Sequence, residues 1–278
     1  MSTATAASAT RVAGMMTFLV NTGVKPVTYP DQQLAEGSRQ IGEYVERTVD
    51  IEDARPRRNE FTLDAQGFAL DDHRSRVTDF FDAAQIREVY YAECEAIVRQ
   101  ATGAEKVVIF DHTYRVEDPD KRKALDLRAP VLTVHNDYTD WSAPKRVRDL
   151  LPADEAETRL GRRYEFINVW RPIVGPVETV PLVLCDARTM EQRDLVAADH
   201  IYDGGRRGET YRVAYGAGQR WYYFSRMTPE EIVLIKCFDS ATDGRARYSA
   251  HGAAKLQVPR PAHAMPRESI EVRTIAFL

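Results

Sequence analysis

Cysteine is scarce in this sequence of 278 residues, and the three cysteines present are far apart. Cys94, Cys185 and Cys237 each lie within apolar sequence. An odd, scattered set of cysteines is not a disulfide framework, and it contains no CxxC pair of the kind that binds zinc. This usage argues against a disulfide-rich secreted scaffold and against a zinc-ribbon protein. It fits a reducing compartment, and we therefore expect a cytoplasmic protein.

A surplus of one charge and a long apolar segment are also missing. The chain carries 38 lysines and arginines against 42 acidic residues, a net charge of −4. This balance provides no strong field that would recruit nucleic acid or an anionic membrane, so neither partner is expected. The apolar run Val12–Val20 is interrupted by Gly14 and Thr17 and is shorter than the roughly 20 residues of a membrane span. We expect residues 1–10 to form a frayed tail and Met16–Val20 to form a first strand.

Nothing in the sequence marks a boundary between domains. No internal repeat, low-complexity tract or glycine–serine linker divides the chain. We therefore predict a single domain over residues 1–278, in which residues 1–105 supply a first strand and helical support and residues 106–278 form the core. The polar stretch Asp50–Asp72 is expected to be an extended surface segment.

Helical periodicity is clear in one segment, Asp82–Ala101, with Asp82 as a suitable N-cap and Thr102-Gly103 as the end. After it the pattern changes to short β-type runs, at residues 106–116, 129–137, 164–170, 180–186, 210–215, 220–224, 231–238 and 269–278. Eight such runs without long helices between them indicate an antiparallel sandwich or barrel. We predict a mainly β fold with flanking α-helices. Two of these helices are short and polar, within residues 142–163 around Pro152, and they are either a candidate lid or solvated surface helices.

The stretch TVHNDYTDW, Thr133–Trp141, places a histidine and a carboxylate at the end of one predicted strand. Side chains two apart in an extended chain point to the same side, so His135 and Asp137 share a face and Asn136 is an outward-facing spacer. A mononuclear Fe(II) oxygenase needs two imidazoles and one carboxylate on one face, with the remaining positions open for a cosubstrate and dioxygen. The pair can supply two of these ligands; alternatively, it is only the polar end of a strand.

The third ligand must be a histidine from another strand, and the chain contains six histidines. His251, in RARYSAHGAAKL, is the best placed, because it lies between the apolar run 231–238 and the C-terminal strand. His200 is expected in a turn before a hairpin, and His263 lies in a loop between prolines. Both remain weaker alternatives.

A basic anchor for a dicarboxylate cosubstrate is the next requirement. In PRESIEVRTIAF, Arg267, Ser269 and Arg273 fall on alternate positions of a strand and so share a face. The planar fork of arginine binds a carboxylate through two hydrogen bonds, and Ser269 adds a hydroxyl. The competing interpretation of Arg267 is an ordinary salt bridge on an edge strand. An H-x-D pair followed by a distal histidine and R-x-S is more specific than any of its parts.

This ordered set resembles that of the jelly-roll Fe(II)/2-oxoglutarate-dependent oxygenases. Three longer phrases are similar more specifically to the gibberellin-desaturase-like and cephem-hydroxylase-like (cephamycin methoxylation component-like) family of fungal and bacterial biosynthesis. They are NVWRPIVGPVETVPLVLCDARTM (168–190), RWYYFSRMTPEEIVLIKCFDS (220–240) and PRESIEVR (266–273). The similarity extends from Val107 to the C-terminus. It implies a double-stranded β-helix (jelly-roll) core, iron bound by His135, Asp137 and His251, and 2-oxoglutarate as cosubstrate.

The resemblance implies a non-heme iron dioxygenase that acts on a small natural-product intermediate. O2 and 2-oxoglutarate would give succinate, CO2 and a ferryl oxidant, which hydroxylates, desaturates or oxidatively cyclises the substrate. The chain departs from the family beside the distal histidine, where it reads Ala250-His251-Gly252 instead of having proline or threonine there. The gap to Arg267 is also longer than usual, which leaves Arg273 or Arg260 as alternative anchors.

Five residues are candidates for the substrate pocket: Tyr138, Asn168, Trp170, Arg171 and Lys236. Asn168 and Trp170 share one face of a strand, and Tyr138 directly follows the ligands, where it and Trp141 can shape the mouth. Core packing is the competing interpretation of Trp170. Lys236 is alone in an apolar strand and would be costly to bury unpaired. It therefore either pairs with a carboxylate of the substrate or cosubstrate or faces solvent at a sheet edge.

A second function class competes with the oxygenase. It is a cupin-like metal-binding isomerase or small-molecule-binding protein, in which the same histidines would hold a metal without activating oxygen. The sequence does not specify the substrate or the oligomeric state.

Overall fold

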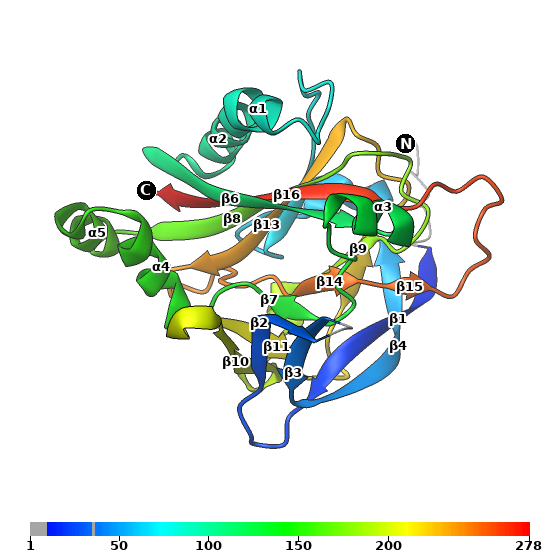
Figure 1. The fold of residues 1–278 in the computed structure, drawn as a ribbon, viewed down its shortest axis with the longest axis horizontal. Coiled ribbons are helices and arrows are strands. Elements are labelled where there is room, and N and C mark those ends of the chain that lie inside the picture. The colour runs from blue at the N-terminus through cyan, green and yellow to red at the C-terminus, as the bar shows by residue number, and fades with distance from the viewer. Residues whose placement is uncertain (1–9, 35–36) are drawn as a thin grey trace, which may run out of the picture.

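The structure is a computed structural model that describes residues 10–34 and 37–278 (Figure 1). The expected frayed tail lies, except for Thr10, outside the described residues. The N-terminal part contains β1 (Arg11–Val20), β2 (Val27–Leu34), β3 (Gly37–Ile41), β4 (Glu43–Asp53), a 3-10 helix (Arg55–Glu60), β5 (Phe68–Asp72), α1 (Ala83–Gln85), the π-helical turn η2 (Ile86–Tyr90) and α2 (Tyr91–Thr102). The middle part contains β6 (Lys106–Val116), α3 (Pro119–Leu125), β7 (His135–Asn136), α4 (Ser142–Leu150), α5 (Ala153–Leu160), β8 (Tyr164–Pro172) and β9 (Leu182–Cys185).

The C-terminal part completes both sheets. Two 3-10 helices (Ala187–Thr189 and Gln192–Asp194) lead into β10 (Leu195–Ile201), and a third (Asp203–Gly205) joins it to β11 (Arg207–Val213). The remaining strands are β12 (Trp221–Tyr223), β13 (Glu231–Asp239), β14 (His251–Ala253), β15 (Lys255–Leu256) and β16 (Glu268–Phe277).

The strands of the described residues form two sheets. The larger one has eleven strands in the order β15-β1-β4-β12-β9-β14-β7-β11-β10-β2-β3, and the smaller one has five in the order β5-β13-β8-β16-β6. Most neighbours are antiparallel, and neighbours in a sheet come from distant parts of the chain, as β14 beside both β7 and β9 shows. The prediction of a mainly β, double-stranded β-helix fold is confirmed.

The interior of the five-stranded sheet is formed by β8 and β13, in which all nine residues of each strand are buried. One face of β8 packs toward the larger sheet, with Phe166 and Trp170 in the same cluster as Leu182 and Leu184 of β9. The other face packs under the long helical segment. Two buried faces explain why the sequences of these strands are mostly apolar and lack a regular alternation of apolar and polar residues.

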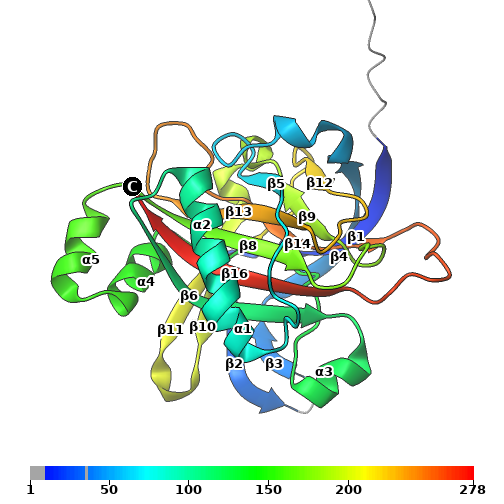
Figure 2. The ribbon, with the colours of Figure 1, turned by 90° about the horizontal axis from the view of Figure 1, so that it is seen from above.

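The helical segment covers the outer face of this sheet, and Figure 2 shows α1 and α2 lying across β6, β8 and β16. Asp82 caps it by accepting hydrogen bonds from the backbone N–H groups of Ala84 and Gln85. It ends at Gly103, whose φ of 73° is the left-handed conformation that glycine adopts at low cost. The segment packs on the sheet through the cluster of Ile86, Tyr90, Cys94, Ile97 and Val98 with Val169, Ile270 and Val272. The predicted helix is therefore confirmed.

Several strands were missed because they carry few apolar residues. β4 buries little more than Val49 and Ile51, and β10 buries only Ala198. The polar stretch 50–72 contains the end of β4, a 3-10 helix and β5, rather than one extended segment. The strand expected at 129–137 is reduced to the two residues of β7. The two short helices around Pro152 are present as α4 and α5.

The N-terminal strand β1 supports the segment that leads into β7. The backbone N–H of Thr17 donates to the carbonyl of Leu132 at 3.0 Å, and the N–H of Val134 donates to the carbonyl of Thr17 at 2.9 Å. Both sheets contain strands from either side of residue 105, and the division of the chain at that point stays a prediction. In the described part of the chain no helix is long and apolar enough to cross a membrane.

Candidate metal centre and cosubstrate pocket

Three side chains meet where β7 and β14 lie side by side. His251 is directly opposite His135 in the antiparallel pairing, and their ring centroids are 4.6 Å apart. Asp137 follows two residues after His135, and its Oδ1 lies 3.7 Å from Nε2 of that histidine. One ligand atom of each residue lies within 4.8 Å of the other two. The structure thus brings together His135, Asp137 and His251, the set predicted from the sequence.

Both imidazoles are oriented by hydrogen bonds to their own strands. Nδ1 of His135 lies 2.9 Å from the carbonyl oxygen of Thr133, and Nδ1 of His251 lies 2.9 Å from that of Ser249. Each Nδ1 therefore carries the proton and donates it, which leaves the lone pair of Nε2 for a metal. Burial and the neighbouring His251 lower the pKa of His135 to about 3. The imidazole of His135 is therefore neutral at neutral pH, as a metal ligand must be.

The carboxylate of Asp137 is held in its ionised form. Asn168, on β8, donates from Nδ2 to Oδ2 of Asp137 at 2.8 Å, and Nε of Arg273 lies 3.5 Å from the same oxygen. Burial opposes ionisation, but the charge of Arg273, together with the hydrogen bond from Asn168, outweighs it and holds the pKa of Asp137 well below its usual range. Asn168 is fully buried, and its Oδ1 has no hydrogen-bond partner among the described residues. Asn168 thus contacts Asp137, a candidate metal ligand. It is not among the residues that line the cavity in front of the candidate ligands.

Replacing Asn168 with leucine should weaken metal binding, because Asp137 loses the hydrogen bond that orients it. Residues that orient metal ligands typically contribute about 10- to 100-fold to metal affinity, and we expect a loss in that range in an anaerobic titration with Fe(II). Thr274→Val is the matched control, because Thr274 is also buried and its Oγ1 donates to the carbonyl of Ile167 at 2.8 Å. Equal metal affinity in the two variants would show that Asn168 does not orient the ligand.

Arg267 is a buried cation without a carboxylate partner among the described residues. It is 4% exposed, its Nη1 donates to the carbonyl of Val180 at 2.8 Å, and Nε and Nη2 each lie 3.3 Å from Oγ of Ser269. Its guanidinium lies over the ring of Trp170, 5.0 Å from the centroid. Burial and the nearby Arg115 lower the pKa of Arg267 to about 9. An anion bound beside Arg267, such as a carboxylate of 2-oxoglutarate, would offset the cost of burying this cation and its repulsion by Arg115.

The two alternative anchors are already engaged. Nη1 of Arg273 lies 3.3 Å from both carboxylate oxygens of Asp111, and Nε contacts Asp137. Arg260 is exposed, donates to the carbonyl of Ala264 and forms an ion pair with Glu117. Of the three arginines, only Arg267 combines burial with an open guanidinium.

The candidate substrate residues fall into two groups. Tyr138 and Trp170 line the cavity at the metal ligands, where the ring of Tyr138 packs on Phe166 with centroids 4.0 Å apart. Arg171 and Lys236 do not line it, which corrects the prediction. The guanidinium of Arg171 faces the opposite side of β8, where it contacts the hydroxyl of Tyr90 and the carbonyls of His73 and Pro229. Trp141, expected at the mouth, is exposed and lies against Arg207.

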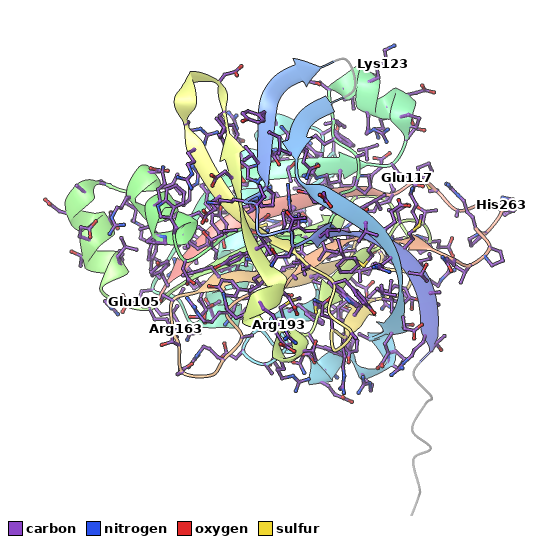
Figure 3. The ribbon with its side chains drawn as sticks, turned by 90° about the horizontal axis from the view of Figure 1, so that it is seen from below. Glu105, Glu117, Lys123, Arg163, Arg193 and His263 are labelled. Atoms are coloured by element: carbon purple, nitrogen blue, oxygen red, sulfur yellow. The ribbon has the colours of Figure 1, made fainter. Side chains whose placement is uncertain are left out.

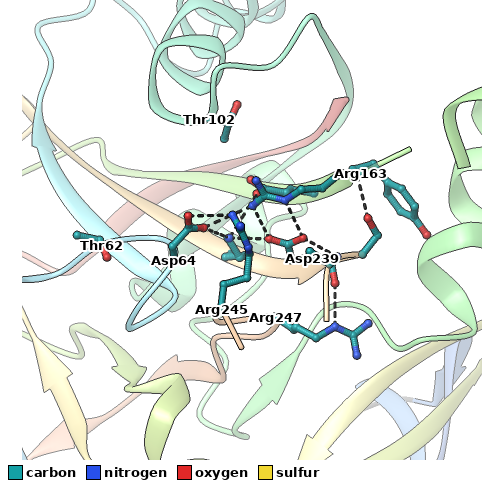
Figure 4. Close-up of polar contacts among 12 residues, drawn as sticks. Thr62, Asp64, Thr102, Arg163, Asp239, Arg245 and Arg247 are labelled. Atoms are coloured by element: carbon teal, nitrogen blue, oxygen red, sulfur yellow. Dashed lines mark hydrogen bonds and ion pairs between the residues drawn. The ribbon is translucent and has the colours of Figure 1, made fainter. Parts of the chain in front are cut away.

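Lys236 is buried in an ion-pair network, so neither expected environment is correct. Its Nζ lies 2.7 Å from Asp64, 2.8 Å from Asp239 and 3.3 Å from Glu165. Arg163 and Arg245 join the same carboxylates (Figure 4). These carboxylates also lie close enough to hold a metal, but the lysine and arginines already neutralise them. The network closes one end of the five-stranded sheet.

Replacing Lys236 with methionine should destabilise the protein, because Glu165 and Asp239 would remain buried with one cation fewer. Removing one partner of a buried ion pair costs about 3 to 5 kcal/mol of unfolding free energy. Lys106→Met is the control, since the Lys106–Glu155 pair is partly exposed and pairs of this kind contribute at most about 1 kcal/mol. Denaturant unfolding of both variants measures the difference, and equal costs would contradict a structural role for the network.

The other histidines do not complete the metal set. His263 lies in the long loop between β15 and β16, which projects from the molecule (Figure 3), and it does not line the cavity at the candidate ligands. His200 is in strand β10 rather than in a turn, and it lines the cavity with Nε2 3.0 Å from Oγ1 of Thr210. Asn136 was expected to be an outward-facing spacer, but it is buried. Its amide donates to the carbonyls of Tyr138 and Cys237 at 2.8 Å each.

The cavity in front of the ligands has a volume of about 1300 Å³ and contains residues that the sequence did not single out. They are Arg115 of β6, Lys145 and Arg146 of α4, Arg212 of β11 and Glu271 of β16. α4 thus forms part of the wall, where a lid was expected. On β6, Asp111, Thr113 and Arg115 alternate in the sequence and line the cavity together, a signal that was available but looked like a polar strand face.

The residues fit a metal and an acidic cosubstrate. Two imidazoles and one carboxylate on a single face are the donor set of a mononuclear Fe(II) oxygenase, and the buried Arg267 lies directly before β16 of the other sheet. Fold and site together define this class of protein.

Comparison with known proteins places the chain in one family of this class. The family described as "Oxidoreductase/YMDC permease-like domain" matches residues 16–277. Hydroxylase/desaturase efuI of Hormonema carpetanum is 35% identical over 257 residues, which cover 84% of each chain. The Fe(II)/2-oxoglutarate-dependent dioxygenase nvfI of Aspergillus novofumigatus (strain IBT 16806) is 33% identical over 235 residues, 82% of each chain.

A solved structure of the iron and alpha-ketoglutarate-dependent endoperoxidase NvfI superposes with a TM-score of 0.85 at 29% identity, covering 96% of this chain and 98% of that one. The chain belongs to this family of hydroxylases, desaturases and 2-oxoglutarate-dependent dioxygenases. The predicted family and its cofactors, Fe(II), 2-oxoglutarate and O2, are confirmed at the level of the family.

Proposed function

We propose that this protein oxidises a small natural-product intermediate, with Fe(II) held by His135, Asp137 and His251 and with 2-oxoglutarate anchored by Arg267 and Ser269. The observation that carries the proposal is the pairing of a His/Asp/His set on one face with a buried arginine that lacks a carboxylate partner among the described residues. When bound, Fe(II) and 2-oxoglutarate supply the activation of O2 and the oxidation of a substrate C–H bond. Hydroxylation, desaturation and oxidative cyclisation all belong to this chemistry.

The residues of the chain position the reactants. Nε2 of each histidine faces the metal position because Nδ1 is used by a backbone carbonyl. The guanidinium of Arg267 and the hydroxyl of Ser269, which contact each other, would donate to the distal carboxylate, and the ring of Trp170 supports the guanidinium from one side. Arg273 neutralises Asp111 and contacts Asp137, so it belongs to the surroundings of the ligand rather than to the cosubstrate anchor. Tyr138 and α4 shape the space left for the substrate.

Removal of the metal tests this proposal. Chelation should abolish O2 consumption, because the His/Asp/His set provides no redox chemistry of its own, and Fe(II) should restore it whereas Zn(II) should not. Succinate formation should match substrate consumption one to one, and an oxygen electrode with chromatography of the products measures both. Tight metal binding without O2 consumption across a broad substrate panel would instead support the cupin-like alternative, which the comparisons do not favour.

We also propose a cytoplasmic location. All three cysteines are buried and unpaired, which fits a reducing compartment.

A further inference from the structure

A buried arginine on the sheet that faces Arg267 has no role in the site described so far. Arg212 lies on β11, is 9% exposed and lines the cavity. It stands directly opposite the ligand His135 in the antiparallel pairing of β11 with β7. Residues opposite each other in such a pair have Cβ atoms about 5 Å apart and point to the same face of the sheet. The side chain of Arg212 therefore leaves the sheet beside the metal ligands.

The guanidinium of Arg212 lacks the partners that a buried cation needs. Its hydrogen bond to Oγ1 of Thr28 is long, at 3.5 Å, and its Nε has no partner among the described residues. No carboxylate of the described part of the chain lies within 4 Å of it. His200 and Thr210, which line the same wall, bond to each other instead. A buried arginine in this state is costly unless an anion joins it when the site is loaded.

The charges around the cavity reinforce this. Ten lysines and arginines line it against five acidic residues, although the whole chain has more acidic than basic residues. The five acidic side chains are already engaged: Asp111 and Glu271 with Arg273, Asp149 with Lys145, Glu209 with Lys25, and Asp137 in the metal set. Arg207, Lys145 and Arg273 use these carboxylates or Asp199 as partners, and no ion pair of the described residues reaches Arg212.

One cosubstrate does not satisfy both open arginines. 2-Oxoglutarate has two carboxylates. In the proposed binding mode one would lie at the metal and the other at Arg267, which would leave none for Arg212. We propose that Arg212 binds a carboxylate of the organic substrate, so that the enzyme oxidises an acid whose anionic end is fixed beside His135. This inference rests on the proposed function for the role of the metal and of Arg267. It also gives a reason for regioselectivity, because an acid fixed at one end presents a defined stretch of its skeleton to the metal.

The test compares acids with their own methyl esters. The full-length protein is loaded anaerobically with Fe(II) and 2-oxoglutarate, and a panel of terpenoid and aromatic monocarboxylic acids, each with its methyl ester, is titrated by calorimetry. The wild-type protein should bind at least one acid about 10-fold or more tightly than its ester. Arg212→Gln should weaken binding of that acid by about 10- to 100-fold and leave the ester and 2-oxoglutarate within about 3-fold. The control Arg148→Gln removes the same charge from the outer side of α4, where Arg148 pairs with Glu157. It should change neither the affinity for the acid nor that for the ester.

Arg212→Lys guards against a folding defect. It keeps the charge and should keep a preference for the acid, whereas loss of that preference in a folded lysine variant would overturn the proposal. Acids that bind the wild type no better than their esters would overturn it too, as would an Arg212→Gln variant that loses acid and ester equally. The charge-transfer band of the Fe(II)–2-oxoglutarate complex reports separately on the proposed function. Its absence with an intact, Arg212-dependent acid preference would refute the iron assignment and leave this site standing.

Discussion

Replacing His251 with alanine is expected to abolish metal-dependent turnover, with a loss on the order of 1000-fold or more. The three-residue set has no spare donor, since the remaining described histidine of the cavity, His200, bonds to Thr210. A metal left with His135 and Asp137 alone loses both affinity and its fixed geometry. Anaerobic Fe(II) titration and succinate release measure the two effects, and His135→Ala should behave in the same way.

His263→Ala is the control for this prediction, because His263 lies in an exposed loop that projects from the molecule (Figure 3). It should retain full metal binding and turnover. A His251→Ala protein that keeps wild-type metal affinity would refute the ligand assignment, whatever its activity. Loss of both properties in the His263 variant as well would indicate general destabilisation instead.

Replacing Arg267 with glutamine is expected to raise the Kd of 2-oxoglutarate by roughly 30- to 1000-fold. The reason is the loss of a buried, charge-assisted contact, for which truncation costs about 2 to 4 kcal/mol. Metal affinity should not change, because Arg267 contacts Val180, Ser269 and Trp170 and none of the ligands. Titration of the anaerobic Fe(II) protein with 2-oxoglutarate measures the effect.

Arg260→Gln separates this anchor from its sequence alternative. Arg260 is exposed and paired with Glu117, so its loss should change the Kd by less than about 2-fold. A larger increase in the Kd for Arg260→Gln than for Arg267→Gln would identify Arg260 as the cosubstrate anchor. Arg267→Lys should fall between the two glutamine variants, because lysine keeps the charge but not the two-pronged geometry.

Local patterns predicted the parts of the site that depend on one strand. His135 and Asp137 share a face because they are two residues apart, and Arg267 and Ser269 do so for the same reason. β8 and β13 were recognisable because strands buried on both faces are mostly apolar, with few polar residues between the apolar ones. What these predictions have in common is that the deciding neighbours lie within a few residues in the sequence.

Pairings between distant strands decided the rest. Arg212 looks like an ordinary surface arginine in the sequence, and only the register of β11 against β7 shows that it stands opposite His135, a proposed metal ligand. Arg171 was expected in the pocket, but its partners are Tyr90 of the helical segment and the carbonyls of His73 and Pro229, on the other side of β8. Lys236 was weighed as exposed or ligand-bound, and the third possibility, a network with Asp64 of a distant turn, was not visible in its own strand.

The two hydrogen bonds between Thr17 and the segment before β7 have a consequence for the inheritance of this site. Strand β7, which carries His135, has only two residues and is too short to be stable alone. Its geometry depends on β1, a strand more than a hundred residues earlier in the chain. An insertion, deletion or proline near Thr17 would therefore act as an active-site mutation at a distance. A gene fragment that keeps every candidate metal ligand but lacks β1 would encode the ligands without the strand that holds His135 in place.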